Sequence, residues 1–241
     1  MTKLGSILIT GTSSGLGEAL AAWALDQGHR VLGTSRRGNP RLSRHDSYFE
    51  VLGDLAHEQS ATETIERLTK DMTDLELVVL NAGILSTFGD LADTELEDLE
   101  RTMRINVFAN QTVLRTLARS GCMPARVVAI SSGAAVNGRR GWGGYALSKA
   151  ALNMLIQLWA RECPQSHFCA LAPGLIDTAM QDVLCDLPGD ERFDSLEFLR
   201  SARHTADMPD PSAAAERLGP LLFELEHHCE SGGYVDVRGM A

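Results

Sequence analysis

Short apolar runs alternate with longer amphipathic stretches along most of the chain. The apolar runs predict strands, and the stretches in which apolar residues recur at helical spacing predict helices. The expected strands are residues 4–10, 30–34, 48–52, 75–80, 127–132, 167–171 and 234–237, and the expected helices are 18–27, 57–70, 94–120, 144–162 and 212–226. This alternation predicts one α/β domain over residues 1–241, with helices on both faces of a doubly wound parallel sheet of about seven strands.

Residues 180–211 interrupt the alternation. They are acidic, irregular and rich in helix-breaking residues. A long segment without a regular pattern is typical of a lid that covers a binding site. We therefore expect a lid in this part of the chain.

Composition narrows the class of protein. The chain has 241 residues, 44% of them hydrophobic, and a formal net charge of −10. Such a charge argues against nucleic acid and anionic membranes as main partners, although the basic pairs Arg36–Arg37 and Arg139–Arg140 can still bind a small anion. The five cysteines are odd in number and show no metal-ligand spacing, so we expect reduced thiols and no bound metal. Because the sequence contains neither a signal-peptide pattern nor an apolar run of about 18 residues, we expect a cytoplasmic location.

A glycine-rich segment separates the first expected strand from the first expected helix. It consists of Gly11, Thr12, Ser13, Ser14, Gly15, Leu16 and Gly17. Glycines allow a sharp turn and a close approach to a pyrophosphate, which binds at the free N–H groups of a helix N-terminus. The context indicates a Rossmann-type dinucleotide site, although the spacing differs from Gly-x-Gly-x-x-Gly. A tight turn without a ligand is the alternative.

The end of the second expected strand bears on the choice of cofactor. In a dinucleotide site a carboxylate there suits a ribose 2′-hydroxyl, and an arginine suits a 2′-phosphate. This chain has Ser35, Arg36 and Arg37 and no acid at that point. The sequence thus favours NADPH over NADH. For Arg37 a solvated basic loop is the alternative.

Polar and small residues follow the next two expected strands. Asp54, which precedes Leu55, could accept a hydrogen bond from an adenine amino group or could cap the following helix. Residues 81–83 are Asn81, Ala82 and Gly83, which suit close backbone packing near a cofactor. Asn106 stands among apolar neighbours, and on its own pattern it resembles a satisfied buried asparagine more than a catalytic one.

Tyr145 and Lys149 are four residues apart and lie on one face of an expected helix. A lysine ammonium beside a phenol favours the phenolate, which makes the tyrosine a better acid–base group near neutral pH. Ser132, at the end of the preceding expected strand, can turn back toward them. A hydroxyl, a phenol and an ammonium would then converge on one substrate oxygen. A Tyr and a Lys on a half-exposed helix are the alternative.

Together the motifs resemble those of the short-chain dehydrogenase/reductase family over nearly the whole chain. The matching residues are Thr10, Gly11, Gly15, Gly17, Asp54, Asn81, Ala82, Gly83, Asn106, Ser132, Tyr145, Lys149, Pro173, Gly174 and Thr178. The resemblance implies a catalytic tetrad of Asn106, Ser132, Tyr145 and Lys149. It also implies an NADPH/NADP+ site in the half formed by about residues 1–120, a catalytic and substrate half from about 121 to 241, and further cofactor contacts from Leu16, Leu55, Pro173, Gly174, Ile176 and Thr178.

In the roles that the resemblance implies, Tyr145 gives a proton to the carbonyl oxygen while NADPH delivers a hydride to the carbon. Ser132 holds that oxygen. Lys149 binds the nicotinamide ribose and lowers the pKa of Tyr145, and Asn106 holds a water in the proton relay.

A narrower resemblance, to sepiapterin reductases and the related bacterial benzil reductases, rests on residues 171–181, 141–142 and 231–236. It implies a substrate site with Trp142, Met180, Gln181 and Asp236, beside Ser132 and Tyr145. Asp236 would anchor the guanidine-like edge of a pterin, or would be an ordinary surface aspartate. Ser14 replaces an arginine common in the glycine loop of sepiapterin reductases, which leaves the 2′-phosphate to Arg36 and Arg37.

The expected function is therefore an NADPH-dependent carbonyl reductase for a ketone or vicinal dicarbonyl, pterin-like or aromatic. The alternatives are a reductase of another ketone, such as a 3-oxoacyl substrate, and an NADPH-sensing protein without catalysis. The family resemblance also implies a homodimer or homotetramer, formed through the outer faces of helices 94–120 and 144–162.

Overall fold

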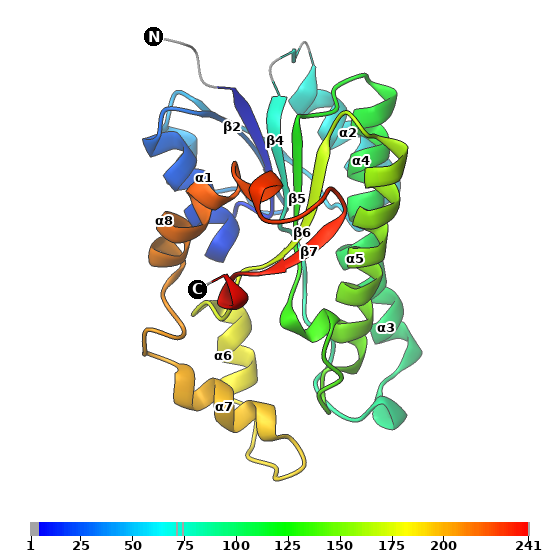
Figure 1. Cartoon of the computed structure of the whole chain (residues 1–241), viewed down its shortest axis with the longest axis vertical. Coiled ribbons are helices and arrows are strands. Elements are labelled where there is room, and N and C mark those ends of the chain that lie inside the picture. The colour runs from blue at the N-terminus through cyan, green and yellow to red at the C-terminus, as the bar shows by residue number, and fades with distance from the viewer. Residues whose placement is uncertain (1–4, 71, 74, 241) are drawn as a thin grey trace.

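The computed structural model describes residues 5–70, 72–73 and 75–240, and the expected strand start at residue 4 lies outside them. One sheet of seven parallel strands runs through the molecule (Figure 1). The strands are β1 (Ser6–Thr10), β2 (Arg30–Ser35), β3 (Tyr48–Leu52), β4 (Leu75–Leu80), β5 (Arg126–Ile130), β6 (His167–Ala172) and β7 (Gly233–Asp236). Their order, β3-β2-β1-β4-β5-β6-β7, confirms the expected doubly wound architecture.

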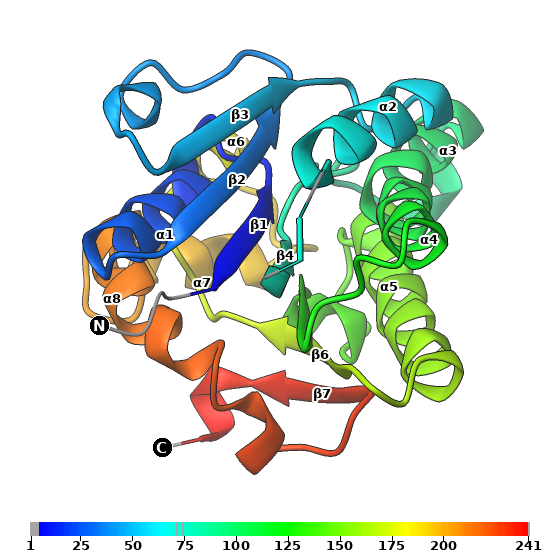
Figure 2. The same cartoon turned by 90° about the horizontal axis from the view of Figure 1, so that it is seen from above.

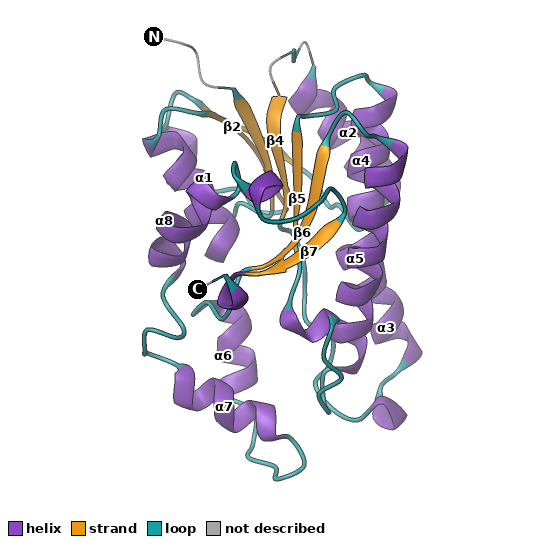
Figure 3. Cartoon of the chain, in the orientation of Figure 1, coloured by secondary structure: helices purple, strands orange, loops and turns teal. Residues whose placement is uncertain are grey.

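Helices cover both faces of the sheet, as Figures 2 and 3 show. The helices are α1 (Gly15–Asp26), α2 (Glu58–Thr69), α3 (Leu96–Met103), α4 (Ala109–Arg119), α5 (Gly143–Glu162), α6 (Ala179–Cys185), α7 (Asp194–Ala202) and α8 (Pro211–Leu221). Helices α1 and α8 lie on one face, and α2, α4 and α5 lie on the other (Figure 2). No helix in the described part of the chain combines the length and the apolar composition needed to cross a membrane.

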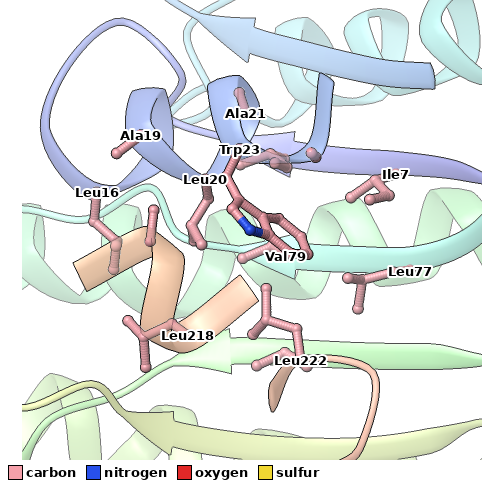
Figure 4. Close-up of a cluster of buried hydrophobic side chains, with 14 of the residues drawn as sticks. Ile7, Leu16, Ala19, Leu20, Ala21, Trp23, Leu77, Val79, Leu218 and Leu222 are labelled. Atoms are coloured by element: carbon pink, nitrogen blue, oxygen red, sulfur yellow. The ribbon is translucent and has the colours of Figure 1, made fainter. Parts of the chain in front are cut away.

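The side chains of each strand pack into two separate apolar cores, one on either face of the sheet. Ile7 of β1 packs under α1 and α8, whereas the next residue, Leu8, packs under the helices of the opposite face. Successive side chains of a strand point to opposite faces, so a strand buried on both faces is apolar throughout. Figure 4 shows the core under α1 and α8, where Trp23, Leu218 and Leu222 lie together.

The helix expected over 94–120 is present from Leu96 to Arg119, but it is not α-helical throughout. Between α3 and α4 the chain forms a π-helical turn, Arg104–Phe108. The Asn106 side chain at its centre accepts a hydrogen bond from Ile84 N (2.8 Å) and donates to Ile84 O (2.9 Å). The wide turn thus lets a helical side chain bind the backbone that follows β4. The boundary at β5 also shifts, because this strand ends at Ile130 and Ser132 instead caps a short turn through Ala134 N.

The expectation that residues 180–211 are irregular is wrong, whereas their role as a lid stays a prediction. The segment holds α6 and α7, and the helix-breaking residues fall mainly between and after them. Leu184, Phe193, Leu196 and Leu199 form an apolar cluster between the two helices and adjoining loops. We call α6 and α7 with this cluster the roof, because they lie beyond the carboxyl ends of the strands (Figure 1). Exposed acidic residues make the helical periodicity of this segment hard to recognise in the sequence.

Candidate active site

A cavity of about 740 Å³ opens at the carboxyl ends of the strands, between the sheet and the roof. This is where ligands bind in open parallel sheets. The predicted site residues that line it are Gly11, Ser13, Ser14, Gly15, Leu16, Ser35, Arg36, Arg37, Asp54, Leu55, Asn81, Ala82, Gly83, Ser132, Trp142, Tyr145, Lys149, Pro173, Gly174, Ile176, Thr178, Met180 and Gln181. Residues far apart in the sequence thus meet in one cavity.

The glycine-rich turn adopts the conformation that its glycines permit. Gly11 and Gly15 have φ angles of 80° and 62°, in the left-handed region that other residues rarely adopt. Asn81 Nδ2 donates to Thr10 O (2.9 Å) and fixes the end of β4 beside the turn. Helix α1 begins at Gly15 with no side-chain cap, so its first N–H groups can bind a ligand in the cavity.

Gly17 does not line the cavity. A Cβ at this position would lie 2.3 Å from Gly11 O and 2.4 Å from Asn81 Nδ2. This glycine therefore allows α1 to pack against the turn, and the prediction of a direct cofactor contact has no support in the structure.

Two exposed arginines, Arg36 and Arg37, follow β2 at the rim of the cavity. Within the described chain neither has an ion pair or a side-chain hydrogen bond. Glu50, the nearest acid along β3, does not line the cavity. Its carboxylate accepts hydrogen bonds from Tyr48 Oη (3.0 Å) and Asn39 N (3.2 Å). The rim is therefore positive where the sequence predicts a 2′-phosphate.

Asp54 is used locally at the start of α2. Its carboxylate accepts a hydrogen bond from Ala56 N (3.0 Å), while its own N–H donates to Ser60 Oγ (3.1 Å). The side chain nevertheless borders the cavity. Both roles considered from the sequence are thus compatible with its position.

Tyr145 and Lys149 lie on the first turns of α5, and both are buried. Lys149 Nζ donates to Ile130 O (2.8 Å) and lies 5.6 Å from the centre of the Tyr145 ring. Burial raises the pKa of Tyr145 to about 12, against an opposing hydrogen bond with Ser132, and burial lowers the pKa of Lys149 to about 8. The Tyr145 shift is opposite to the one expected from the Tyr–Lys spacing, because the loss of water on burial outweighs the hydrogen bond with Ser132.

The start of α5 is held by several contacts. Ser86 Oγ accepts a hydrogen bond from Tyr145 N (2.9 Å). Trp142 packs 5.9 Å from the Tyr145 ring, between centroids, and its Nε1 donates to Ser195 Oγ of the roof (2.9 Å). The roof and Tyr145 are thereby joined through one indole ring.

Asn106 and Asp236 do not line the cavity. Both N–H groups of the Asn106 amide have partners, Ile84 O and Ser148 Oγ (each 2.9 Å). The Asp236 carboxylate binds Arg238 through Nε (2.9 Å) and Nη2 (2.6 Å), and Arg238 holds its pKa below the ordinary value. The Asn106 side chain therefore links the segment after β4 to α5. The predicted contact of Asp236 with substrate has no support in the structure.

Several cavity residues were missed by sequence reasoning. They are Asn137, Ser195, Phe198, Leu199 and Arg238. Each lies in a loop or on the roof, where spacing carries no signal. Arg139, from the basic pair that the sequence singles out for a small anion, also lines the cavity. In the described ranges no group of His, Cys, Asp or Glu side chains could hold a metal ion.

The chain is similar to known oxidoreductases in sequence and in fold. Residues 6–186 match the model of the short chain dehydrogenase family. An uncharacterized oxidoreductase of Schizosaccharomyces pombe is 32% identical over 225 residues, which cover 90% of each chain. The (S)-benzoin-forming benzil reductase of Bacillus subtilis is 28% identical, over 96% of this chain and 97% of its own. The Pseudomonas aeruginosa RhlG/NADP complex has a TM-score of 0.78 at 25% identity, over 97% of this chain and 94% of that one.

Proposed function

The chain belongs to the short-chain dehydrogenase family and is an oxidoreductase; from this premise we propose that it is an NADPH-dependent carbonyl reductase for ketones or vicinal dicarbonyls. The observation that carries the proposal is the meeting of Ser132, Tyr145 and Lys149 in the cavity that also contains the glycine-rich turn. The similarity to a benzil reductase favours a vicinal dicarbonyl as substrate.

The residues of the cavity fit a nicotinamide dinucleotide. The N-terminus of α1 offers backbone donors for the pyrophosphate. Lys149 Nζ has three N–H donors, and Ile130 O is the one acceptor found for it among the described residues. The ribose hydroxyls would supply the missing acceptors. The Thr34 hydroxyl is buried in the cavity wall and has no hydrogen-bond partner in the described chain.

NADPH is favoured over NADH by Arg36 and Arg37, which could bind a 2′-phosphate at the end of β2. The similarity to a structure with bound NADP agrees with this choice. Glu50, the carboxylate that could bind a 2′-hydroxyl instead, is engaged by Tyr48 and Asn39.

The proton chemistry follows from the environment of the reacting groups. When bound, NADPH supplies the hydride for the carbonyl carbon and leaves as NADP+. Tyr145, with its pKa raised to about 12, keeps its proton at neutral pH and donates it to the carbonyl oxygen. Ser132 donates a hydrogen bond that orients the same oxygen. The buried Lys149 ammonium stabilises the phenolate that Tyr145 becomes.

The test is the oxidation of NADPH with benzil, sepiapterin or a 3-oxoacyl thioester as substrate, in the wild type and in Tyr145→Phe. We expect turnover of benzil and a fall of at least about 100-fold in kcat in the variant, because the proton donor is lost. NADPH binding, measured by fluorescence, serves as the control for folding and is retained.

Undiminished turnover in Tyr145→Phe would contradict the proposed mechanism. Turnover of the thioester alone would keep the mechanism and change the substrate class. A wild-type protein that binds NADPH and reduces none of the three compounds would support the non-catalytic alternative.

A further inference from the structure

Positive side chains lie at the substrate end of the cavity, although the chain as a whole is acidic. Arg139 lines the cavity from the loop before α5, and its guanidinium lies 6.0 Å from the centre of the Phe198 ring on the roof. Arg238 lines it from the turn after β7. The function proposed above uses neither residue.

Arg238 is close to the catalytic serine. A Cβ at Gly133, the residue after Ser132, would lie 2.6 Å from Arg238 Nη2 and 3.5 Å from Asn137 Nδ2. Two nitrogen donors thus lie beside the hydroxyl that would hold the carbonyl oxygen, and Asp236 Oδ2, which binds Arg238, lies 3.7 Å from the same point. The absence of a side chain at Gly133 leaves the space that they occupy.

The acids nearby leave part of this positive charge uncompensated. Asp236 binds Arg238 through Nε and Nη2, and among the described residues no partner is found for Nη1, which can donate to a ligand. Asp177, the one acid lining this end of the cavity within the described chain, is paired with Arg203 and His204. In the same part of the chain Arg139 has no carboxylate partner. Asp236 balances the charge of Arg238, so the positive charge left for an anion is that of Arg139, and Arg238 adds a hydrogen-bond donor.

The remaining walls near Tyr145 are apolar. Trp142, Phe198 and Leu199 line the cavity. Phe198 is 50% exposed. An aromatic or aliphatic group would bury apolar surface against them. The ligand that fits this end has an apolar body and an anionic group next to the reacting carbonyl.

We propose that the preferred substrates are anionic vicinal carbonyl compounds, specifically 2-oxo carboxylates with an apolar side chain, and that Arg139 and Arg238 bind their carboxylate. This proposal rests on the proposed reductase function. The product would be the 2-hydroxy acid, with the proton on oxygen from Tyr145 and the hydride on carbon from NADPH.

The experiment compares phenylglyoxylate with its methyl ester, which has nearly the same shape and no charge. We expect the wild type to reduce the acid with the higher kcat/KM. In Arg139→Gln and Arg238→Gln the acid-to-ester ratio of kcat/KM falls about tenfold, because each removes a charged hydrogen bond. Arg140→Gln is the matched control, since Arg140 pairs with Asp90 outside the cavity and its loss leaves the ratio as in the wild type.

The experiment distinguishes failure of the anion preference from failure of the reductase function. If the ester and benzil are reduced but the ratio is the same in all four proteins, the anion preference is wrong and the reductase function stands. If none of the compounds is reduced, the function fails. Calorimetry of phenylglyoxylate binding with NADP+ present then decides the anion site, and equal or absent binding in the wild type and Arg139→Gln overturns it.

Discussion

At the scale of single residues, Arg36 is exposed, lies on the cavity rim and has no ion pair with any residue that the structure describes. A guanidinium in that state can bind a phosphate without breaking an existing contact, and arginine forms paired hydrogen bonds with phosphate oxygens. The choice of cofactor should therefore depend strongly on this residue.

We predict that Arg36→Gln raises the KM for NADPH about tenfold, because a charged hydrogen bond to the 2′-phosphate is lost. The KM for NADH, which lacks this phosphate, stays within about twofold. Steady-state kinetics with both cofactors measure the two values. Arg44→Gln is the control, since this exposed arginine does not line the cavity. Equal effects on the two cofactors would contradict the assignment.

Lys149 is a buried cation, and its burial costs stability. Only 4% of the residue is exposed, and its pKa falls from 10.5 to about 8 because burial disfavours the charged form. Between these two pH values the unfolded state binds more protons than the folded state. The free energy of unfolding contributed by Lys149 therefore rises as the pH increases from 8 to 10.5.

We predict that Lys149→Met, without cofactor, is more stable than the wild type at pH 7 by up to about 3 kcal/mol, the free energy equivalent of the pKa shift. The difference should shrink as the pH rises through 8 toward 10. Urea unfolding at four pH values measures it. Lys70→Met is the matched control, because Lys70 is exposed. A difference that is constant with pH would contradict the buried-cation account.

At the scale of elements, the contact between α1 and α8 depends on one small residue. A Cβ at Gly219 of α8 would lie 2.3 Å from the Trp23 ring of α1. The two helices can therefore approach closely only because that position has no side chain. Alanine is the better helix former by about 1 kcal/mol, but close-packed interiors tolerate added atoms poorly.

We predict that Gly219→Ala lowers the free energy of unfolding by about 1–3 kcal/mol, because the Trp23 ring must move. Thermal and urea unfolding measure the change. Gly138→Ala is the control, since a Cβ there has no neighbour within 4 Å. An equal or higher stability of Gly219→Ala would mean that the helices separate without cost.

The sequence predicted elements whose pattern is local and missed features made by distant contacts. The strands, the glycine-rich turn and the Tyr145–Lys149 pair each carry a pattern within a few residues. The π-helical turn at Asn106 depends on a bond to Ile84, 22 residues away, which no helical periodicity reveals. Arg238 meets Gly133 across more than 100 residues, so its place in the cavity was equally hidden.

At the scale of the whole molecule, apolar side chains remain uncovered on one outer face. Leu147, Met154 and Leu158 on α5 are each 53% exposed and share a side of the helix, and Phe108 lies before α4. Exposed apolar patches of this kind mark association surfaces. They lie on the two helices from which we expected a homodimer or homotetramer.

We predict that the protein assembles at micromolar concentration and that Met154→Lys with Leu158→Lys shifts it toward the monomer, because two charges would enter a buried interface. Size-exclusion chromatography with light scattering measures the mass. Val183→Lys is the control, since Val183 is 60% exposed on the roof, away from α5. A monomeric wild type would contradict the prediction.

The roof has a consequence for how such an enzyme evolves. Its apolar cluster shares no residue with the two cores beside the sheet. Substitutions within the α6–α7 cluster can therefore accumulate without opening the two cores beside the sheet. Descendants of one gene can in this way acquire new substrates while they inherit the same redox chemistry unchanged.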